Sequence, residues 1–139
     1  MPETIRAFAG VKDVSFTPAG DPARPIPCLE SLDDEIAIEE TAHANADGAH
    51  DVCVRARRIS RRVTIRSTDL AALEALPLNA LGTLRWTLVG KGAAADRTLA
   101  ARARVVRPVA YSGGDGHAPV VASVVLALLS DDGLTSPVH

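Results

Sequence analysis

The sequence predicts a mainly β protein: an antiparallel β-sandwich or barrel of about six to eight strands, with one short helix at about residues 68–76. Several segments between residues 29 and 130 alternate apolar and polar side chains with the period of a β-strand. Clusters rich in Gly, Pro and Asp separate these segments. One short stretch combines helix-capping residues with a following proline, which predicts the helix.

A chain of 139 residues predicts a single domain, spanning residues 1–139, that is long enough to bury a core. Hydrophobic residues make up 47% of the chain and charged residues 23%, which is typical of a globular protein. Aromatic residues make up only 3%, so we expect an aliphatic core. The same scarcity disfavours a surface that stacks nucleobases on aromatic rings.

The N-terminal part begins with a predicted arm at residues 1–9 and a first strand at Val11–Phe16. The Pro- and Gly-rich residues 18–27 predict a loop.

The segment Leu29–Thr41 alternates between an acidic and an apolar parity, which predicts a strand with one buried face. The apolar parity is formed by Leu32, Ile36 and Ile38. A short helix is the alternative, because the acids near Asp33 also suit the first turn of a helix.

Residues 43–50 are small and polar and predict a loop that is long enough to form a projecting arm between two strands. The following strand, from Asp51 to Arg66, is dense in arginine. Its apolar parity changes midway, which predicts a β-bulge near Arg58 to Arg61.

The predicted helix follows this strand directly. Ser67 or Thr68 suits its N-cap, Asp69 suits its first turn and Pro77 ends it. Because a helix of about two turns is unstable by itself, we expect its leucines to pack on the sheet.

Three further strands are predicted after the helix. Gly82–Gly90 and Arg97–Val109 alternate, which predicts one buried face in each. Val120–Ser130 is apolar on both parities, which predicts a strand covered on both sides. Residues 131–139 predict a short C-terminal tail.

Charge is unevenly distributed along a chain whose formal net charge is -2. Eight acids and no Lys or Arg lie between Pro25 and Asp51: Glu30, Asp33, Asp34, Glu35, Glu39, Glu40, Asp47 and Asp51. Six arginines and no acid follow: Arg55, Arg57, Arg58, Arg61, Arg62 and Arg66. The net charge and the lack of aromatic residues disfavour a nucleic-acid patch. We expect most of these arginines to pair with carboxylates of the same chain or of a neighbouring copy.

No catalytic, metal or cofactor site is predicted, and we expect the protein not to be an enzyme. His43, Asp47 and His50 share one loop but lack the spacing of a metal site, so we expect a solvated loop. No nucleophile motif accompanies the acidic strand. The sequence favours reduced, buried thiols for Cys28 and Cys53, and a disulfide between them remains an alternative.

The chain start has no apolar signal segment, and the longest apolar run, Ala118 to Leu129, is too short to span a bilayer. We therefore expect synthesis in a cytoplasm and no membrane partner.

Four segments, in order along the chain, resemble the major tail proteins, or tail tube proteins, of long-tailed phages, prophages and gene transfer agents. They are Gly10–Phe16, Arg62–Leu73, Leu81–Leu88 and the ending Ser130–Val138. The last segment is similar to the Asp-Gly-x-Thr-Ser-Pro ending common in small tail tube proteins.

This resemblance implies a β-sandwich or barrel whose copies form hexameric rings, stacked into a tube for DNA ejection. Strands from each copy would join a continuous β-barrel lining a negative channel, where DNA is present only in transit. The acidic strand supplies the lumen candidates Glu30, Glu35 and Glu39. The subunit-interface candidates are Arg55, Arg57, Arg58, Arg61, Arg62, Arg66, His43, Asp47 and His50.

The implied partners are other copies of the chain and other tail proteins, namely tape measure, terminator and baseplate proteins, with no cofactor. The implied location is the virion tail, after synthesis in the host bacterial cytoplasm. A tail terminator, a baseplate hub protein or a secretion-system tube protein remains an alternative. A monomeric β-sandwich binding module is a further alternative, although it would need an aromatic-lined groove.

Overall fold

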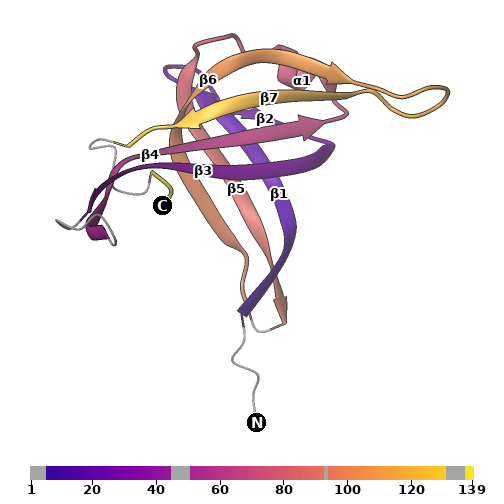
Figure 1. The fold of residues 1–139 in the computed structure, drawn as a ribbon. Helices are drawn as coiled ribbons and strands as arrows, with labels where there is room; N and C mark the ends of the chain where they lie inside the picture. Colours follow the sequence, from indigo (N-terminus) through magenta and orange to yellow (C-terminus); the bar gives the residue numbers. More distant parts are fainter. Residues whose placement is uncertain (1–5, 45–50, 93, 131–136) are drawn as a thin grey trace.

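The computed structural model describes the backbone of residues 6–44, 51–92, 94–130 and 137–139, and their side chains except at 6–7, 41–44 and 51–58. Over these residues the chain forms one antiparallel sheet of seven strands and one short helix (Figure 1). The elements are β1 (Arg6–Pro18), β2 (Arg24–Pro25), β3 (Leu29–Ala44), β4 (Asp51–Ser67), α1 (Leu70–Glu74), β5 (Leu81–Gly92), β6 (Arg97–Ser112) and β7 (Val121–Leu128). The predicted mainly β fold with one helix is confirmed.

The strand order in the sheet is β2-β1-β5-β6-β7-β4-β3, so the sheet is open and β3 forms one edge. It curls until β3, β4 and β7 lie across β1, β5 and β6 (Figure 1). One sheet therefore supplies both layers of the core.

The core is aliphatic, as predicted, with two aromatic additions. Ile65 and Leu126 come from one layer and Phe16 and Leu84 from the other, and all four are fully buried. Trp86 joins them at 3% exposure. Each such side chain contributes about 1.5–3 kcal/mol of hydrophobic stabilisation.

The neighbouring strands β1 and β5 approach closely where β5 begins. Gly82 lies opposite Pro18 of β1, and a Cβ added there would lie 2.2 Å from the Thr17 carbonyl oxygen. Only glycine fits at this contact.

The turn from β4 into α1 is fixed by Ser67, which is fully buried. Its hydroxyl donates to the Pro27 carbonyl oxygen at 2.6 Å and accepts from the Asp69 N–H at 3.0 Å. Asp69 is the N-cap, since its carboxylate accepts from the Ala72 N–H at 3.2 Å. The predicted capping by Ser67 or Thr68 is thus wrong by one or two residues. Leu73, fully buried, docks the helix as expected.

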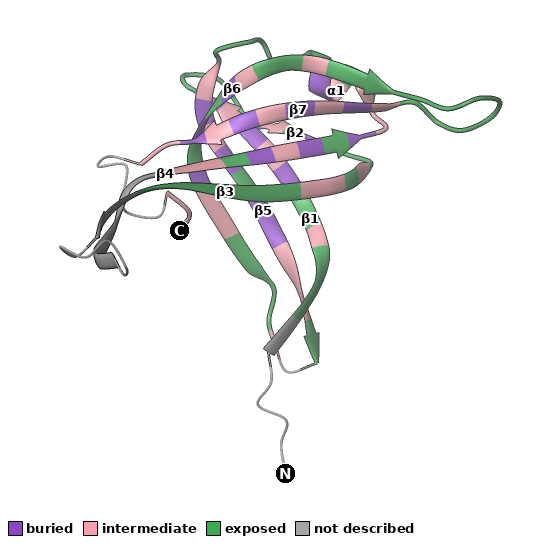
Figure 2. Ribbon diagram, in the orientation of Figure 1, coloured by how far each residue is buried: buried purple, intermediate pink, exposed green. Residues whose placement is uncertain are grey.

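β7 corrects a second prediction. Its even-numbered residues from Ala122 to Leu128 are buried, whereas its odd-numbered residues are only half-buried (Figure 2). The strand is therefore buried on one face and only half-buried on the other, although its sequence is apolar on both.

The bulge predicted in the arginine strand exists, slightly earlier than expected. Glu39 pairs with Arg58 and Glu40 pairs with Ala56, so Arg57 is the extra residue. At the N-terminus, β1 already begins at Arg6, inside the range assigned to the arm.

Two predicted segments fall wholly or mostly outside the described residues. These are the projecting loop, of which 45–50 lie outside, and the C-terminal tail, of which 131–136 lie outside. At the chain end, His139 exchanges two backbone hydrogen bonds with Ala100 of β6, at 2.8 and 2.9 Å.

Candidate assembly surface

The β3–β4 hairpin extends from one side of the body (Figure 1). Its two strands pair from Leu29↔Ser67 to Ala44↔Asp51. β7 pairs with β4 only over Arg61–Ser67. Beyond that stretch the hairpin has no third strand beside it within the described part of the chain. We call residues 36–44 and 51–60 the hairpin arm.

One face of the hairpin continues the core face outward. Leu32 lies opposite the buried Ile65, but further along Ile36 lies opposite Arg61 and Ile38 opposite Ile59. Ile36 is 55% exposed and Ile38 is 53% exposed. The expectation that both isoleucines are buried is therefore wrong, because the core ends before the strand does. The period-2 pattern correctly predicted which side chains of β3 share a face. It could not predict how far along the strand that face is buried.

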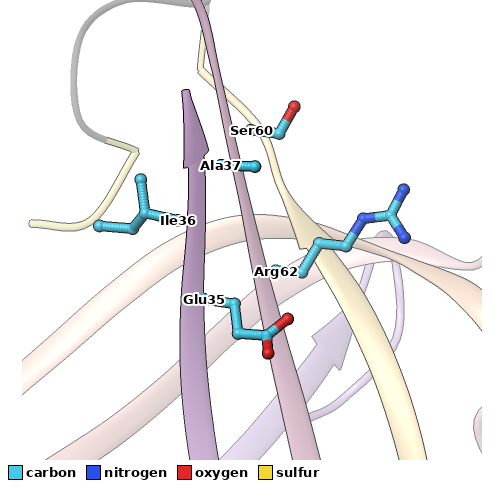
Figure 3. A pocket seen from close by; sticks show the side chains of 5 residues that line it. All are labelled: Glu35, Ile36, Ala37, Ser60 and Arg62. Atoms are coloured by element: carbon cyan, nitrogen blue, oxygen red, sulfur yellow. The ribbon is translucent and has the colours of Figure 1, made fainter. Parts of the chain in front are cut away.

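The opposite face of the hairpin carries charge. Glu35 lies opposite Arg62, and Glu39 lies opposite Arg58. The side chains of Glu35 and Arg62 are directed to the same side of the hairpin, and Ile36 is directed to the other (Figure 3). A hollow of about 270 Å³ at this place is lined by Glu35, Ile36, Ala37, Ser60 and Arg62. Acidic and basic strands adjacent in one sheet favour each other electrostatically.

Where the core ends, Arg61 and Asp34 form a bidentate ion pair. The Arg61 Nε donates to both carboxylate oxygens, at 2.9 and 3.0 Å, and Nη2 donates to Oδ2 as well. Both side chains are partly shielded, at 22% and 27% exposure. The hydrogen bond to Asp34 raises the pKa of Arg61. At least one arginine of the run thus pairs within its own chain.

The lumen candidates Glu30, Glu35 and Glu39 all lie exposed on β3. Of the interface candidates, Arg62 and Arg66 are exposed on β4, and Arg61 is half-buried. The side chains of His43, Arg55, Arg57 and Arg58 lie outside the described set, as do Asp47 and His50 entirely.

The two edges of the sheet differ in regularity. β1 pairs with β2 only at Ser15 and Phe16, and its other pairing is broken by two register shifts. β3 pairs without a shift from Ser31 to Glu39. Bulges blunt an edge against strand addition, whereas a regular exposed edge favours it. The edge of β3 is therefore the one suited to another strand.

Metal-binding clusters and membrane-spanning helices are not found in the described part of the chain. The described residues contain no group of three or more His, Cys, Asp or Glu side chains placed to hold a metal. Cys28 is a free, exposed thiol, so its predicted burial is wrong. Among the described helices, none has the length and apolar character needed to cross a membrane.

Comparison with known proteins gives a fold relationship. No protein-family profile and no curated protein matches the chain. A chain in a solved structure titled as the cryo-EM structure of the anti-feeding prophage baseplate, 6-fold symmetrised, is similar with a TM-score of 0.56. The two share 10% sequence identity, over 94% of this chain and 95% of that chain. At this identity the likeness shows a shared fold over nearly the full length of both.

Proposed function

We propose that this protein is a non-catalytic structural subunit of a phage-tail-like assembly, which forms hexameric rings stacked into a tube for DNA ejection. The observation that supports this most directly is the hairpin arm. Its β3 edge has no further strand beside it among the described residues and runs without a register shift from Ile36 to Glu39, and it carries two exposed isoleucines, Ile36 and Ile38. An exposed edge of this kind in a stable protein calls for a covering partner.

A second copy is the partner we propose. If the arm of one copy adds to the sheet of the next, the contact is head-to-tail, and a suitable rotation closes it into a ring. The shared fold with a chain from a 6-fold symmetrised baseplate structure supports this geometry. Tape measure, terminator and baseplate proteins are the further partners proposed, with the virion tail as the location.

The charged face of the hairpin would then line the channel. Glu30, Glu35 and Glu39 are exposed there, and Arg62 and Arg66 alternate with them on the adjacent strand. Neighbouring opposite charges lower the net field that passing phosphates meet. We therefore propose a channel wall of mixed charge that binds DNA weakly, in place of a purely acidic one.

A second candidate is a baseplate ring component, favoured by the structural neighbour, which comes from a baseplate structure. Both candidates use the same ring contact. They differ in whether rings of this chain stack on one another.

Negative-stain electron microscopy with light scattering tests the proposal. We expect rings or tubes from the parent protein at high concentration, and monomers from Ile36→Asp or Ile38→Asp, because a carboxylate cannot be buried unpaired in the contact. Leu78→Asp is the matched control, since Leu78 is 52% exposed away from the hairpin.

The outcomes separate the candidates. Stacked tubes support the tube subunit, and single rings that never stack support the baseplate component. A parent protein that stays monomeric at every concentration, or a control variant that loses assembly equally, contradicts both.

A further inference from the structure

The outer face of β7 carries a surface that the ring contact does not use. Its side chains, Val121, Ser123, Val125 and Ala127, are only half-buried, whereas the alternate residues of the strand are buried. They are small and mostly apolar, which is unusual for a solvated strand face. The apolar sequence of β7 is typical of a strand whose two faces are both packed against other parts of a protein.

Arginines flank this face on both neighbouring strands. Arg62 of β4 and Arg104 of β6 both lie opposite Ala127. Arg66 lies opposite Ser123, and Arg107 lies opposite Val125. Since strands are about 4.8 Å apart, the two arginine rows lie roughly 10 Å apart.

These arginines are available to a ligand. All four are exposed, and none makes an ion pair with any residue that the structure describes. At one end, the face deepens into a hollow of about 370 Å³, lined by Glu30, Ser31, Arg66, Tyr111, Ser112, Val121 and Ser123. Glu30 is the one acid in that lining.

We propose that this surface, the β7 outer face with its two arginine rows, binds an extended acidic segment of another protein chain. Successive side chains of an extended chain point to opposite sides, so neighbouring carboxylates reach both arginine rows. Arginine pairs with carboxylates in two-pronged geometry, and the methylene groups of glutamate can cover Val125 and Ala127. The inference goes beyond ring formation and does not depend on it, although Arg62 and Arg66 belong both to this surface and to the proposed channel wall, so a bound segment would occupy part of that wall.

The geometry favours a peptide over nucleic acid. A duplex, whose major groove alone is about 12 Å wide, would reach past the arginine rows onto Asp33 and Glu35 of β3, where its phosphates meet like charge. A single-stranded nucleic acid gains part of its affinity from stacking on several aromatic rings, whereas the four outward side chains of β7 offer no ring and the adjoining hollow offers one, Tyr111. A narrow, flexible chain of carboxylates meets neither obstacle.

Fluorescence anisotropy with a labelled octaglutamate peptide tests this. We expect saturable binding that weakens as salt rises, no binding of octaglutamine, and weaker binding of octathymidylate. Arg62→Glu and Arg104→Glu should each weaken octaglutamate binding about tenfold, by removing one attraction and adding one repulsion. Arg104→Gln, which removes only the attraction, should weaken it about threefold.

Arg97→Glu is the matched control. Arg97 is exposed on the same strand as Arg104, but it lies opposite Leu88, on the core-facing side. Arg97→Glu and Arg104→Glu each replace +1 by -1, so each moves the net charge from -2 to -4. Equal weakening by both variants, equal affinity for octathymidylate, or no octaglutamate binding overturns the proposal. Circular dichroism of each variant confirms that the fold is retained.

Discussion

Ser67 joins three parts of the chain that are distant in sequence. Its buried hydroxyl satisfies the Pro27 carbonyl oxygen before β3 and the Asp69 N–H at the start of α1, while Ser67 itself ends β4. The sequence predicts Ser67 or Thr68 as the N-cap of the helix, whereas Asp69 is the N-cap. A serine before a helix predicts a hydrogen bond to the helix, and nothing in the sequence indicates the Pro27 carbonyl.

We expect Ser67→Ala to lower the free energy of unfolding by about 1–3 kcal/mol, because it leaves two backbone groups unsatisfied in a buried site. Urea denaturation measures the change. Ser112→Ala, at an exposed position, should alter stability by less than about 0.5 kcal/mol. Equal effects from the two variants would show that the buried hydroxyl contributes nothing specific.

Lys12 and Asp96 give the protein a pH-sensitive contact. Lys12 Nζ lies 2.8 Å from Asp96 Oδ2, and Asp96 Oδ1 accepts from the Gly90 N–H at 2.8 Å. The hydrogen bond from Lys12, followed by that from Gly90, lowers the pKa of Asp96. The unfolded chain therefore binds this proton at a higher pH than the folded protein does. The stabilisation is present above the ordinary carboxyl pKa of about 4 and is lost as pH falls through the lower folded value.

Replacing Lys12 by Met should raise the pKa of Asp96 towards its ordinary value, although only in part, because the Gly90 hydrogen bond remains. A carbon-13 NMR titration of the Asp96 carboxyl group measures this. Lys91→Met, which removes a lysine that makes no ion pair with any residue that the structure describes, serves as the control. An unchanged pKa in Lys12→Met would contradict the assignment of cause.

At the scale of elements, strand identity was predictable and strand environment was not. The alternation in β5 gave the buried positions of Leu84 and Trp86 correctly. The same rule misplaced Ile36 and Ile38 of β3, which lie past the end of the core. Periodicity defines which side chains share a face, whereas burial depends on which other strands lie beside and across that face.

The hairpin arm can be separated from the body, which tests its role directly. Ala37 and Ser60 are register partners, so a two-residue Asn-Gly turn can replace residues 38–59. We expect the shortened protein to unfold cooperatively within about 5 °C of the parent, since β4 keeps its pairing with β7. Ring formation should be lost. Circular dichroism melting and light scattering measure the two properties.

Shortening the β6–β7 connection in the same way is the control. Ser112 and Val121 are register partners, so Asn-Gly can replace residues 113–120. We expect this variant to assemble like the parent. Loss of folding in the first variant would mean that the arm stabilises the body, and retained rings would mean that the arm is not the ring contact.

At the scale of the whole molecule, one open sheet forms both layers that enclose the core. Its curl brings β3, β4 and β7 across β1, β5 and β6, which explains why the sequence pattern of a sandwich is satisfied without a second sheet (Figure 1). The order β6-β7-β4 brings Arg104 and Arg62 to either side of Ala127, although they are far apart in the sequence. The combined arginine surface is a product of strand order, which local patterns do not encode.

The sequence by itself determined the fold class and the single short helix. These follow from local alternation and capping chemistry. Only the tertiary structure decided that the acidic and the basic strand pair with each other, where the core ends along β3, that the outer face of β7 is only half-buried, and that arginines from two separate strands flank it. The physical reason is that burial and charge neighbourhoods arise from pairings between distant segments, and one strand placed differently in the sheet would change them all.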